Sequence, residues 1–322
     1  MRYLALGSVI LGLLFGATRA DAQSYPSGPI RLVVPSGPGT QSDLVSRALA
    51  QRLGPVLGQP VVVDNRPGAD GMLAVEAVVA APADGLTLVN VQSGSLTIAP
   101  LLYASRIRYD VERDLAPVTL TVRATFVMTV NGATSVRSLK ELVAFTKANP
   151  RTAALAHMPG AAYLGALVAK QVLAADIELV PYKAAPAIWT DLFGGRVHAG
   201  IEPVGGAYPQ IKAGKLRAIA LLGAARTTLL PDVPTATEQG FSGMEIDAWN
   251  ALFVRAGTSS AVIERLQRES VRILEAAEVK DQLLAGGMEV LTSDPATLAK
   301  RVRDDRAKWE RVIREFNVKP DN

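Results

Sequence analysis

Short apolar runs alternate along this chain with longer segments in which apolar residues recur every three or four positions. The short runs have the length and the β-branched content of buried strands, and the longer segments have the period of amphipathic helices. The predicted strands cover residues 30–34, 61–63, 86–89, 126–130, 177–180, 197–201 and 216–222. The predicted helices cover residues 44–57, 71–81, 139–148, 261–277 and 295–316. This alternation is typical of α/β folds, in which helices cover parallel sheets.

Two further strand-like stretches, near residues 119–121 and 245–253, stand where the chain could cross between two domains and return. A length of 322 residues also suits two domains better than one. We therefore expect a discontinuous first domain, residues 23–121 plus 247–322, and an inserted second domain, residues 122–246. Small ligands usually bind in the cleft between two such domains.

The first 22 residues have the three parts of a secretory signal peptide. Arg2 supplies a positive charge, residues 4–17 form an apolar run, and Ala20-Asp21-Ala22 forms a small-x-small cleavage pattern. The apolar run is shorter than the ~20 residues of a membrane-spanning helix. We expect cleavage between Ala22 and Gln23 and a mature protein in the periplasm.

The composition narrows the classes of function. The absence of cysteine excludes disulfides, thiolate catalysis and metal–thiolate sites, and the presence of only two histidines argues against a multi-histidine metal site. Aromatic residues make up 5% of the chain and the net charge is +4, which argues against a nucleic-acid-binding protein. No Gly-x-Ser-x-Gly, His-Glu-x-x-His or P-loop motif is present. We expect a monomer that is not an enzyme and uses no metal or cofactor.

A polar loop at residues 35–43 (PSGPGTQSD) lies between the first predicted strand and the first predicted helix. Its glycines allow close approach of a ligand, and the free N–H groups at the start of the helix favour an anion such as a carboxylate. An ordinary turn with Ser42 or Asp43 as the N-cap is an equal alternative. Residues 64–71 and 93–97 form similar polar loops after the next two strands, so all three loops should meet at one crevice.

A dinucleotide site is a second interpretation of the same region. Gly37-Pro38-Gly39 follows a strand, and Asp64 ends the next strand, as in the dinucleotide-binding fingerprint. However, Ser42 occupies the third glycine position, and an exported protein meets little cofactor. A third interpretation is a ligand sensor that acts on a signalling partner.

Many ordered segments of the chain resemble one family, the substrate-binding proteins of tripartite tricarboxylate transporters, also called Bug receptors. The matching segments are residues 25–31 (YPSGPIR), 35–43, 58–69 (GQPVVVDNRPGA), 82–88 (PADGLTL), 180–183 (VPYK), 192–195 (LFGG), 211–218 (IKAGKLRA) and 230–235 (LPDVPT). The resemblance covers nearly the whole mature chain. It implies a periplasmic-binding-protein type II fold, in which two α/β domains close over a small organic acid and deliver it to membrane permease subunits of the transporter.

The resemblance also implies ligand-binding positions on loops of both domains. In the first domain these are Ser36, Gly37, Gly39, Thr40, Asp43, Ser93 and Ser95. In the second domain they are His157, Gly160, Ala161, Lys183, Ala184 and Glu202. On this basis we expect Asp43→Ala to weaken ligand binding more than folding. Glu202 could also select a cationic group of the ligand or be an ordinary capping carboxylate, and His198 is expected to be structural.

The chain departs from the family pattern in both domains. The loop HMPGAAY at residues 157–163 has lost the usual hydroxyl groups, and Tyr182-Lys183-Ala184 lacks the usual glycine after the lysine. Ser36 stands where a bulky aromatic residue is common. These changes leave fewer side-chain donors and more apolar surface, so our hypothesis is that the ligand is a larger or less polar monocarboxylate.

Overall fold

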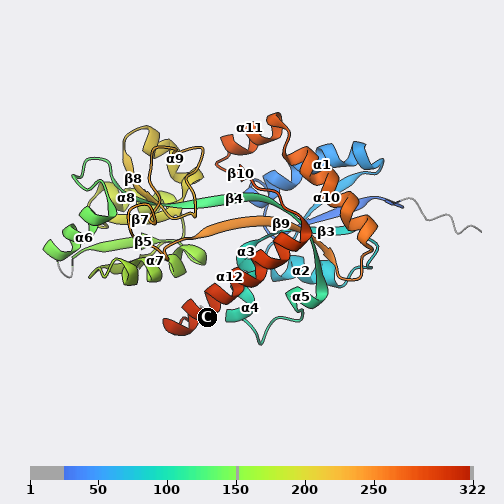
Figure 1. Ribbon diagram of the computed structural model, residues 1–322, viewed down its shortest axis with the longest axis horizontal. Coiled ribbons are helices and arrows are strands. Elements are labelled where there is room, and N and C mark those ends of the chain that lie inside the picture. Colours follow the sequence, from blue (N-terminus) through green and yellow to red (C-terminus); the bar gives the residue numbers. More distant parts are fainter. Residues whose placement is uncertain (1–24, 150–151, 320–322) are drawn as a thin grey trace, which may run out of the picture.

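The computed structural model describes residues 25–149 and 152–319 of the chain, so the predicted signal peptide lies outside the described part. Ten strands of these residues form one mixed sheet that runs through two lobes (Figure 1). In the first lobe the strand order is β2 (Val61–Asn65), β1 (Ile30–Val34), β3 (Thr87–Gln92), β9 (Asp247–Arg255) and β4 (Leu115–Asn131). β1 is parallel to β2 and β3, whereas β9 is antiparallel to β3 and β4.

The second lobe continues the sheet from the far end of β4. Its strands follow the order β4, β7 (Ala199–Pro203), β5 (Ala154–His157) and β6 (Glu178–Pro181). The short strands β8 (Leu216–Leu221) and β10 (Glu289–Val290) also pair with β4. Residues 115–125 of β4 pair with β9, and residues 126–131 pair with β7 and β8. A single long strand therefore belongs to both lobes.

Helices cover both faces of the sheet in each lobe (Figure 1). In the first lobe they are α1 (Gln41–Leu57), the short 3-10 helix η1 (Ala69–Gly71), α2 (Met72–Val79), α3 (Ser93–Thr97), α4 (Ala99–Leu102), α5 (Val111–Asp114), α10 (Ser260–Leu274) and α11 (Ala277–Ala285). In the second lobe they are α6 (Leu139–Ala148), α7 (Ala161–Val172), α8 (Ala185–Phe193) and α9 (Val204–Lys212). The last helix is α12 (Pro295–Glu315).

α12 packs against both lobes. Leu298 and Val302, near its start, are buried with Val75 and Trp249 in a core of the first lobe. Trp309 and Val312, two to three turns further on, are buried in the core of the second lobe. The helix therefore forms a third connection beside β4 and β9.

The elements with strong local signals are confirmed. Ser138 caps α6 by accepting a hydrogen bond from the N–H of Glu141, and Asp294 caps α12 in the same way, with Pro295 at its first position. The sequence analysis missed α3 to α5, α7 to α9 and α11. Helix α9 illustrates the reason, because Gly205, Gly206 and Pro209 give it a poor intrinsic propensity that only packing overcomes.

Candidate functional site

A cavity of about 1110 Å³ lies between the two lobes. The first lobe lines it with the loops after β1, β2 and β3, at residues 35–37, 67–71 and 92–95. Because these three strands are parallel neighbours, their carboxyl ends lie at one edge of the sheet. The predicted convergence of three polar loops is confirmed. The second lobe contributes the ends of β5 and β6 and the first turn of α7.

Seven of the thirteen predicted binding residues line this cavity: Ser36, Gly37, Ser93, Ser95, His157, Gly160 and Ala161. The other six do not line it: Gly39, Thr40, Asp43, Lys183, Ala184 and Glu202. Lys183 and Ala184 are exposed in the connection between β6 and α8. The last residue of β6 that lines the cavity is Pro181.

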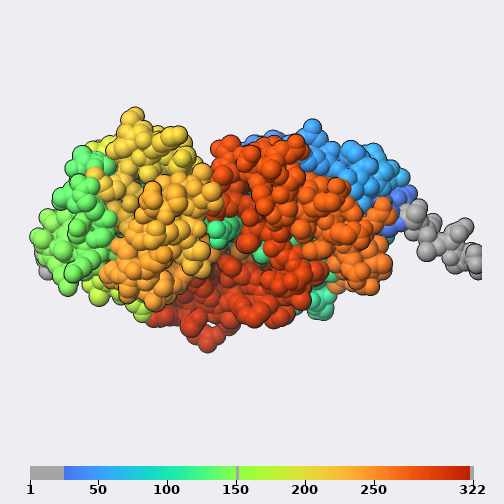
Figure 2. Space-filling model, turned by 45° about the horizontal axis from the view of Figure 1, so that its top comes forward, coloured from blue at the N-terminus to red at the C-terminus, as the bar shows by residue number. Residues whose placement is uncertain are grey.

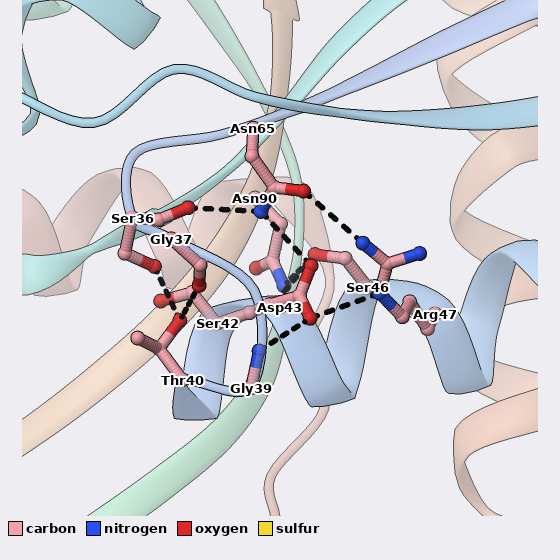
Figure 3. A network of polar contacts seen from close by, with 10 residues as sticks. All are labelled: Ser36, Gly37, Gly39, Thr40, Ser42, Asp43, Ser46, Arg47, Asn65 and Asn90. Carbon is pink, nitrogen blue, oxygen red and sulfur yellow. Dashed lines mark hydrogen bonds and ion pairs between the residues drawn. The ribbon is translucent and has the colours of Figure 1, made fainter.

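Asp43 is a structural residue of the loop that precedes α1 (Figure 3). The residue is 1% exposed, and its carboxylate accepts hydrogen bonds from the Gly39 N–H, from Arg47 Nε and from Asn65 Nδ2, each over 2.9 Å. Asn65 Nδ2 also donates to the Ser36 carbonyl over 2.8 Å. The Asp43 side chain therefore joins the loop to α1 and to the end of β2.

This network corrects two expectations about the start of α1. The helix begins at Gln41 rather than at residue 44, and its N-cap is Thr40, not Ser42 or Asp43. The Thr40 hydroxyl bonds to Ser36 and to the Gly37 carbonyl instead of capping the helix. Among the described residues no side chain caps the first turn of α1, and Gln41 at its start lines the cavity, so the expected anion site at this helix start stays a prediction.

Burial would raise the pKa of Asp43, but the hydrogen bonds from Arg47, Gly39 and Asn65 outweigh it and hold the pKa below its ordinary value. The group is therefore ionised at neutral pH. Three protein donors already bond to its two oxygens, so these contacts use Asp43 to hold the loop, and a role in ligand binding stays a prediction.

Two amide side chains that the sequence analysis missed, Gln92 and Asn250, line the cavity. Both donate to the buried Ser42 hydroxyl, Gln92 Nε2 over 3.1 Å and Asn250 Nδ2 over 2.7 Å. Ser42 thus fixes polar groups from the ends of β3 and β9. The sequence signal was present, because each amide interrupts or ends an otherwise apolar strand.

The start of α7 forms the wall of the cavity opposite these amides. Gly160, its N-cap, has φ 71° and ψ −132°, a conformation that favours glycine. The N–H groups of the first turn, at residues 161–163, lack acceptors within the helix. Because Gly160 and Ala161 both line the cavity, these donors and the positive end of the α7 dipole lie beside it.

His157, the last residue of β5, lies next to this helix start. It is 4% exposed, lines the cavity, and stacks on the Tyr163 ring with centroids 4.9 Å apart. The other histidine, His198, is structural as expected, because its Nδ1 accepts the Ala154 N–H over 3.2 Å.

Glu202 is buried behind the cavity, and neither expected role describes it. Its carboxylate is 0% exposed and accepts hydrogen bonds from Thr129 Oγ1 over 2.8 Å and from Trp189 Nε1 over 2.5 Å. Burial raises its pKa more than these two bonds lower it. The sequence could not show this, because it does not reveal that α8 carries Trp189 over the end of β7.

The cavity carries little charge. Among its described lining residues, Asp70 and Lys319 are the only acidic or basic side chains, apart from His157. Lys319 follows the end of α12 and gave no signal in the sequence, because nothing there predicts that the tail returns to the cleft. Apolar side chains form much of the remaining wall, including Ile98, Val122, Phe126, Leu164 and Leu179.

The dinucleotide interpretation finds no support in the position of Asp64. Its carboxylate accepts hydrogen bonds from Arg31 Nε over 2.7 Å and from Arg66 Nε over 3.0 Å, so it is a structural ion pair rather than a free ribose ligand. Within residues 25–149 and 152–319 no group of acidic or histidine side chains could hold a metal ion. No helix in the described part of the chain has the length and hydrophobicity to cross a membrane.

Comparison with protein families gives one match over most of the chain. Residues 45–318 match the family described as "Tripartite tricarboxylate transporter family receptor". The chain is 33% identical to a UPF0065 protein of Bordetella bronchiseptica, over 99% of this chain and 94% of that protein. It is 32% identical to the protein BugT of Bordetella pertussis, over 99% and 98% of the two chains.

Solved structures show the same similarity. A structure described as a periplasmic transporter is 30% identical, with a TM-score of 0.75 over 92% of this chain and 100% of that one. Rpa4515 of R. palustris, solved with adipate, is 28% identical, with a TM-score of 0.75 over 92% and 99% of the two chains. MatC of Rhodopseudomonas palustris, solved with bound malate, is 27% identical, with a TM-score of 0.71 over 90% and 100%.

Proposed function

Because the chain belongs to the tripartite tricarboxylate transporter receptor family, whose members are solute-binding receptors and not enzymes, we propose that it captures a small organic carboxylate between its two lobes and delivers it to a membrane permease. The protein would act in the periplasm as a monomer, after removal of residues 1–22. The observation that carries this function is the cavity between the lobes, with the first turn of α7 on one side and fixed amides on the other.

The polar groups of the cavity suit an anion held without a full salt bridge. The N–H groups at the start of α7 and the side-chain amides of Gln92 and Asn250 are neutral donors. Neutral donors give moderate affinity, since little of the binding energy comes from pairing of opposite charges. Moderate affinity suits a receptor that must release its ligand to a permease.

We infer that the lobes close about β4 and β9. The proposed division assigns residues 23–121 plus 247–322 to one domain and residues 122–246 to the other. What supports this division is the change of pairing in β4, from β9 up to Thr125 to β7 from Phe126, a few residues beyond the proposed boundary. A few residues of continuous strand can serve as a hinge for closure around a ligand.

The apolar wall indicates the class of carboxylate. Phe126, Ile98, Leu164 and Leu179 present hydrocarbon surface to a cavity that exceeds what a four-carbon acid fills. Adipate and malate are bound by similar receptors, and both carry two carboxylates. Here the scarcity of fixed positive charge supports a ligand with one carboxylate and an aromatic or branched body.

Titration calorimetry on the mature protein, residues 23–322, tests this function. We expect benzoate and branched-chain monocarboxylates to bind with affinities at least about tenfold higher than malate, because their apolar bodies remove more hydrocarbon surface from water. Malate and adipate serve as the matched dicarboxylates. Tighter binding of the two dicarboxylates would contradict the ligand class, and no heat with any organic acid would contradict the receptor function.

A further inference from the structure

His157 is a titratable side chain that lines the cavity, and one nitrogen of its ring is bonded to the protein. That bond fixes the tautomer and leaves the other ring nitrogen unused. Nδ1 lies 3.1 Å from the Met158 carbonyl oxygen. A carbonyl oxygen only accepts hydrogen bonds, so Nδ1 must carry the proton and donate it. In the neutral ring Nε2 is then a bare lone pair.

Nε2 of His157 has no hydrogen-bond partner among the described residues. The sealed side-chain atoms without a partner belong to Arg31, Thr125, Asp247 and Ser270, and Nε2 is not among them. His157 lines the cavity, and its ring is held against Tyr163. Because Nδ1 is bonded to the Met158 carbonyl, Nε2 is the ring nitrogen left for a ligand in the cavity.

No charged side chain in the described part of the chain already settles the protonation of His157. The His157 ring stacks on Tyr163 of α7. In the sheet, His157 is paired with Pro181 of β6 and with Ile201 of β7. Glu202, the next residue along β7, is bonded to Thr129 and Trp189. The charged groups on the cavity wall are Asp70 and Lys319.

We propose that His157 couples ligand capture to a proton: Nε2 takes up one proton from solvent as the ligand carboxylate enters and donates it in a hydrogen bond to that carboxylate. A carboxylate and a neutral Nε2 both present lone pairs, so they repel until the ring is protonated. The positive charge is present only while the ligand is bound, so this pair adds to the neutral donors of the cavity, and the proton returns to solvent when the ligand leaves. This inference rests on the proposed function, since it requires an anion in the cavity.

The state of the site before a ligand binds agrees with this coupling. Burial lowers the pKa of His157 below its ordinary value, and the hydrogen bond to the Met158 carbonyl only partly opposes it. Without a ligand the ring is therefore neutral at neutral pH. A bound anion favours the charged ring and raises its pKa, so protons and carboxylate increase each other's affinity.

Calorimetry with benzoate measures both the affinity and the number of protons taken up. Benzoate stays ionised between about pH 5.5 and about pH 7.5, because its carboxyl group titrates near the range of an ordinary side-chain carboxyl. We expect at least about threefold tighter binding at the lower pH, with a limit of about tenfold per pH unit for one coupled proton. Titration in two buffers of different ionisation enthalpy should show uptake of up to one proton.

Three variants separate His157 from the other groups. His157→Gln should bind with the same affinity at both pH values and take up no proton. His198→Gln, the only other histidine position, should keep the pH dependence, and Glu202→Gln should keep it as well. Pairs of buffers applied to the unsubstituted protein test the coupling even if His157→Gln does not fold.

The outcomes distinguish this inference from the proposed function. Benzoate binding with equal affinity at both pH values and no proton uptake overturns the role of His157 and leaves the receptor function standing. Proton uptake that persists in His157→Gln also overturns it. Absence of binding by benzoate, adipate and malate at every pH overturns both.

Discussion

At the scale of single residues, the structure separates side chains that line the cavity from those that hold its loops. Asp43 belongs to the second kind, although its position in the sequence resembles a ligand-binding one. Its carboxylate has three protein donors, from Gly39, Arg47 and Asn65. Removing one member of a buried, charge-assisted network leaves the others without partners, which costs more than the bond itself.

We therefore expect Asp43→Asn to lower the free energy of unfolding by about 1–3 kcal/mol, and to weaken carboxylate affinity less than it weakens folding. This reverses the order expected from the sequence for Asp43→Ala. Urea unfolding and calorimetry on the same sample measure the two effects. Asp304→Asn, which removes an exposed pair with Lys300, is the control and should cost less than about 1 kcal/mol. Equal losses for the two variants would contradict the structural role.

The same carboxylate gives a pH dependence of known sign. Because the pKa of Asp43 is lowered on folding, its contribution to stability is present above the unfolded pKa, about 4. The contribution is lost as the pH falls through the lower, folded value. The stability difference between the unsubstituted protein and Asp43→Asn should therefore shrink below about pH 4, and a constant difference down to about pH 2 would argue against the ion pair.

At the scale of elements, the proposed function assigns the ligand anion to the start of α7. Gly160 allows the turn from β5 into the helix, because its positive φ is costly for any other residue. An added Cβ would meet no atom within 4 Å, so the cost of a substitution is backbone conformation alone.

Gly160→Ala should lower the free energy of unfolding by about 1–3 kcal/mol through this strain and should weaken benzoate affinity at least about tenfold, because the N–H groups of the first turn shift. Gly195→Ala is a matched control, since Gly195 has φ 70°, has no neighbour within 4 Å and does not line the cavity. It should cost similar stability with unchanged affinity. If both variants bind alike, α7 does not hold the ligand.

At the scale of the whole molecule, the lobes also touch on the side away from α12. Gly205, at the start of α9, meets Gly287, in the turn between α11 and β10, so closely that an added Cβ on Gly205 would lie 2.5 Å from the Gly287 Cα. Beside them Glu289 joins the lobes, because its carboxylate accepts from Arg123 Nε over 2.9 Å and from the Thr228 N–H over 2.6 Å. In Figure 2, α9 and α11 lie on opposite sides of the groove between the lobes.

Gly205→Ala should hold this side of the groove apart and weaken benzoate affinity by about tenfold, because closure of the lobes then costs free energy. The radius of gyration from small-angle scattering in saturating benzoate should exceed that of the unsubstituted protein. Gly206→Ala, one residue away with no neighbour within 4 Å, is the control. Indistinguishable scattering and affinity for the two variants would show that the glycine contact does not limit closure.

The sequence by itself determined the elements whose signals are local. The strands predicted at residues 30–34 and 61–63 follow from apolar β-branched runs, and α6 and α12 follow from their caps. The order of strands and polar loops was enough to predict an α/β fold with one crevice, because the ends of parallel strands meet at one edge. Seven of the thirteen predicted binding residues lie on that crevice, and four of them follow the ends of β1 and β3 for this reason.

The tertiary structure decided which polar groups line the cavity and which are bonded within the protein. Asp43 and Glu202 look alike in the sequence as carboxylates close to the end of a predicted strand, yet each is bonded to groups from other elements. Lys319 and Asn250 reach the cavity only because α12 and β9 return across both lobes. Hydrogen-bond partners distant in the sequence are fixed by packing, and packing leaves no periodic trace in the chain.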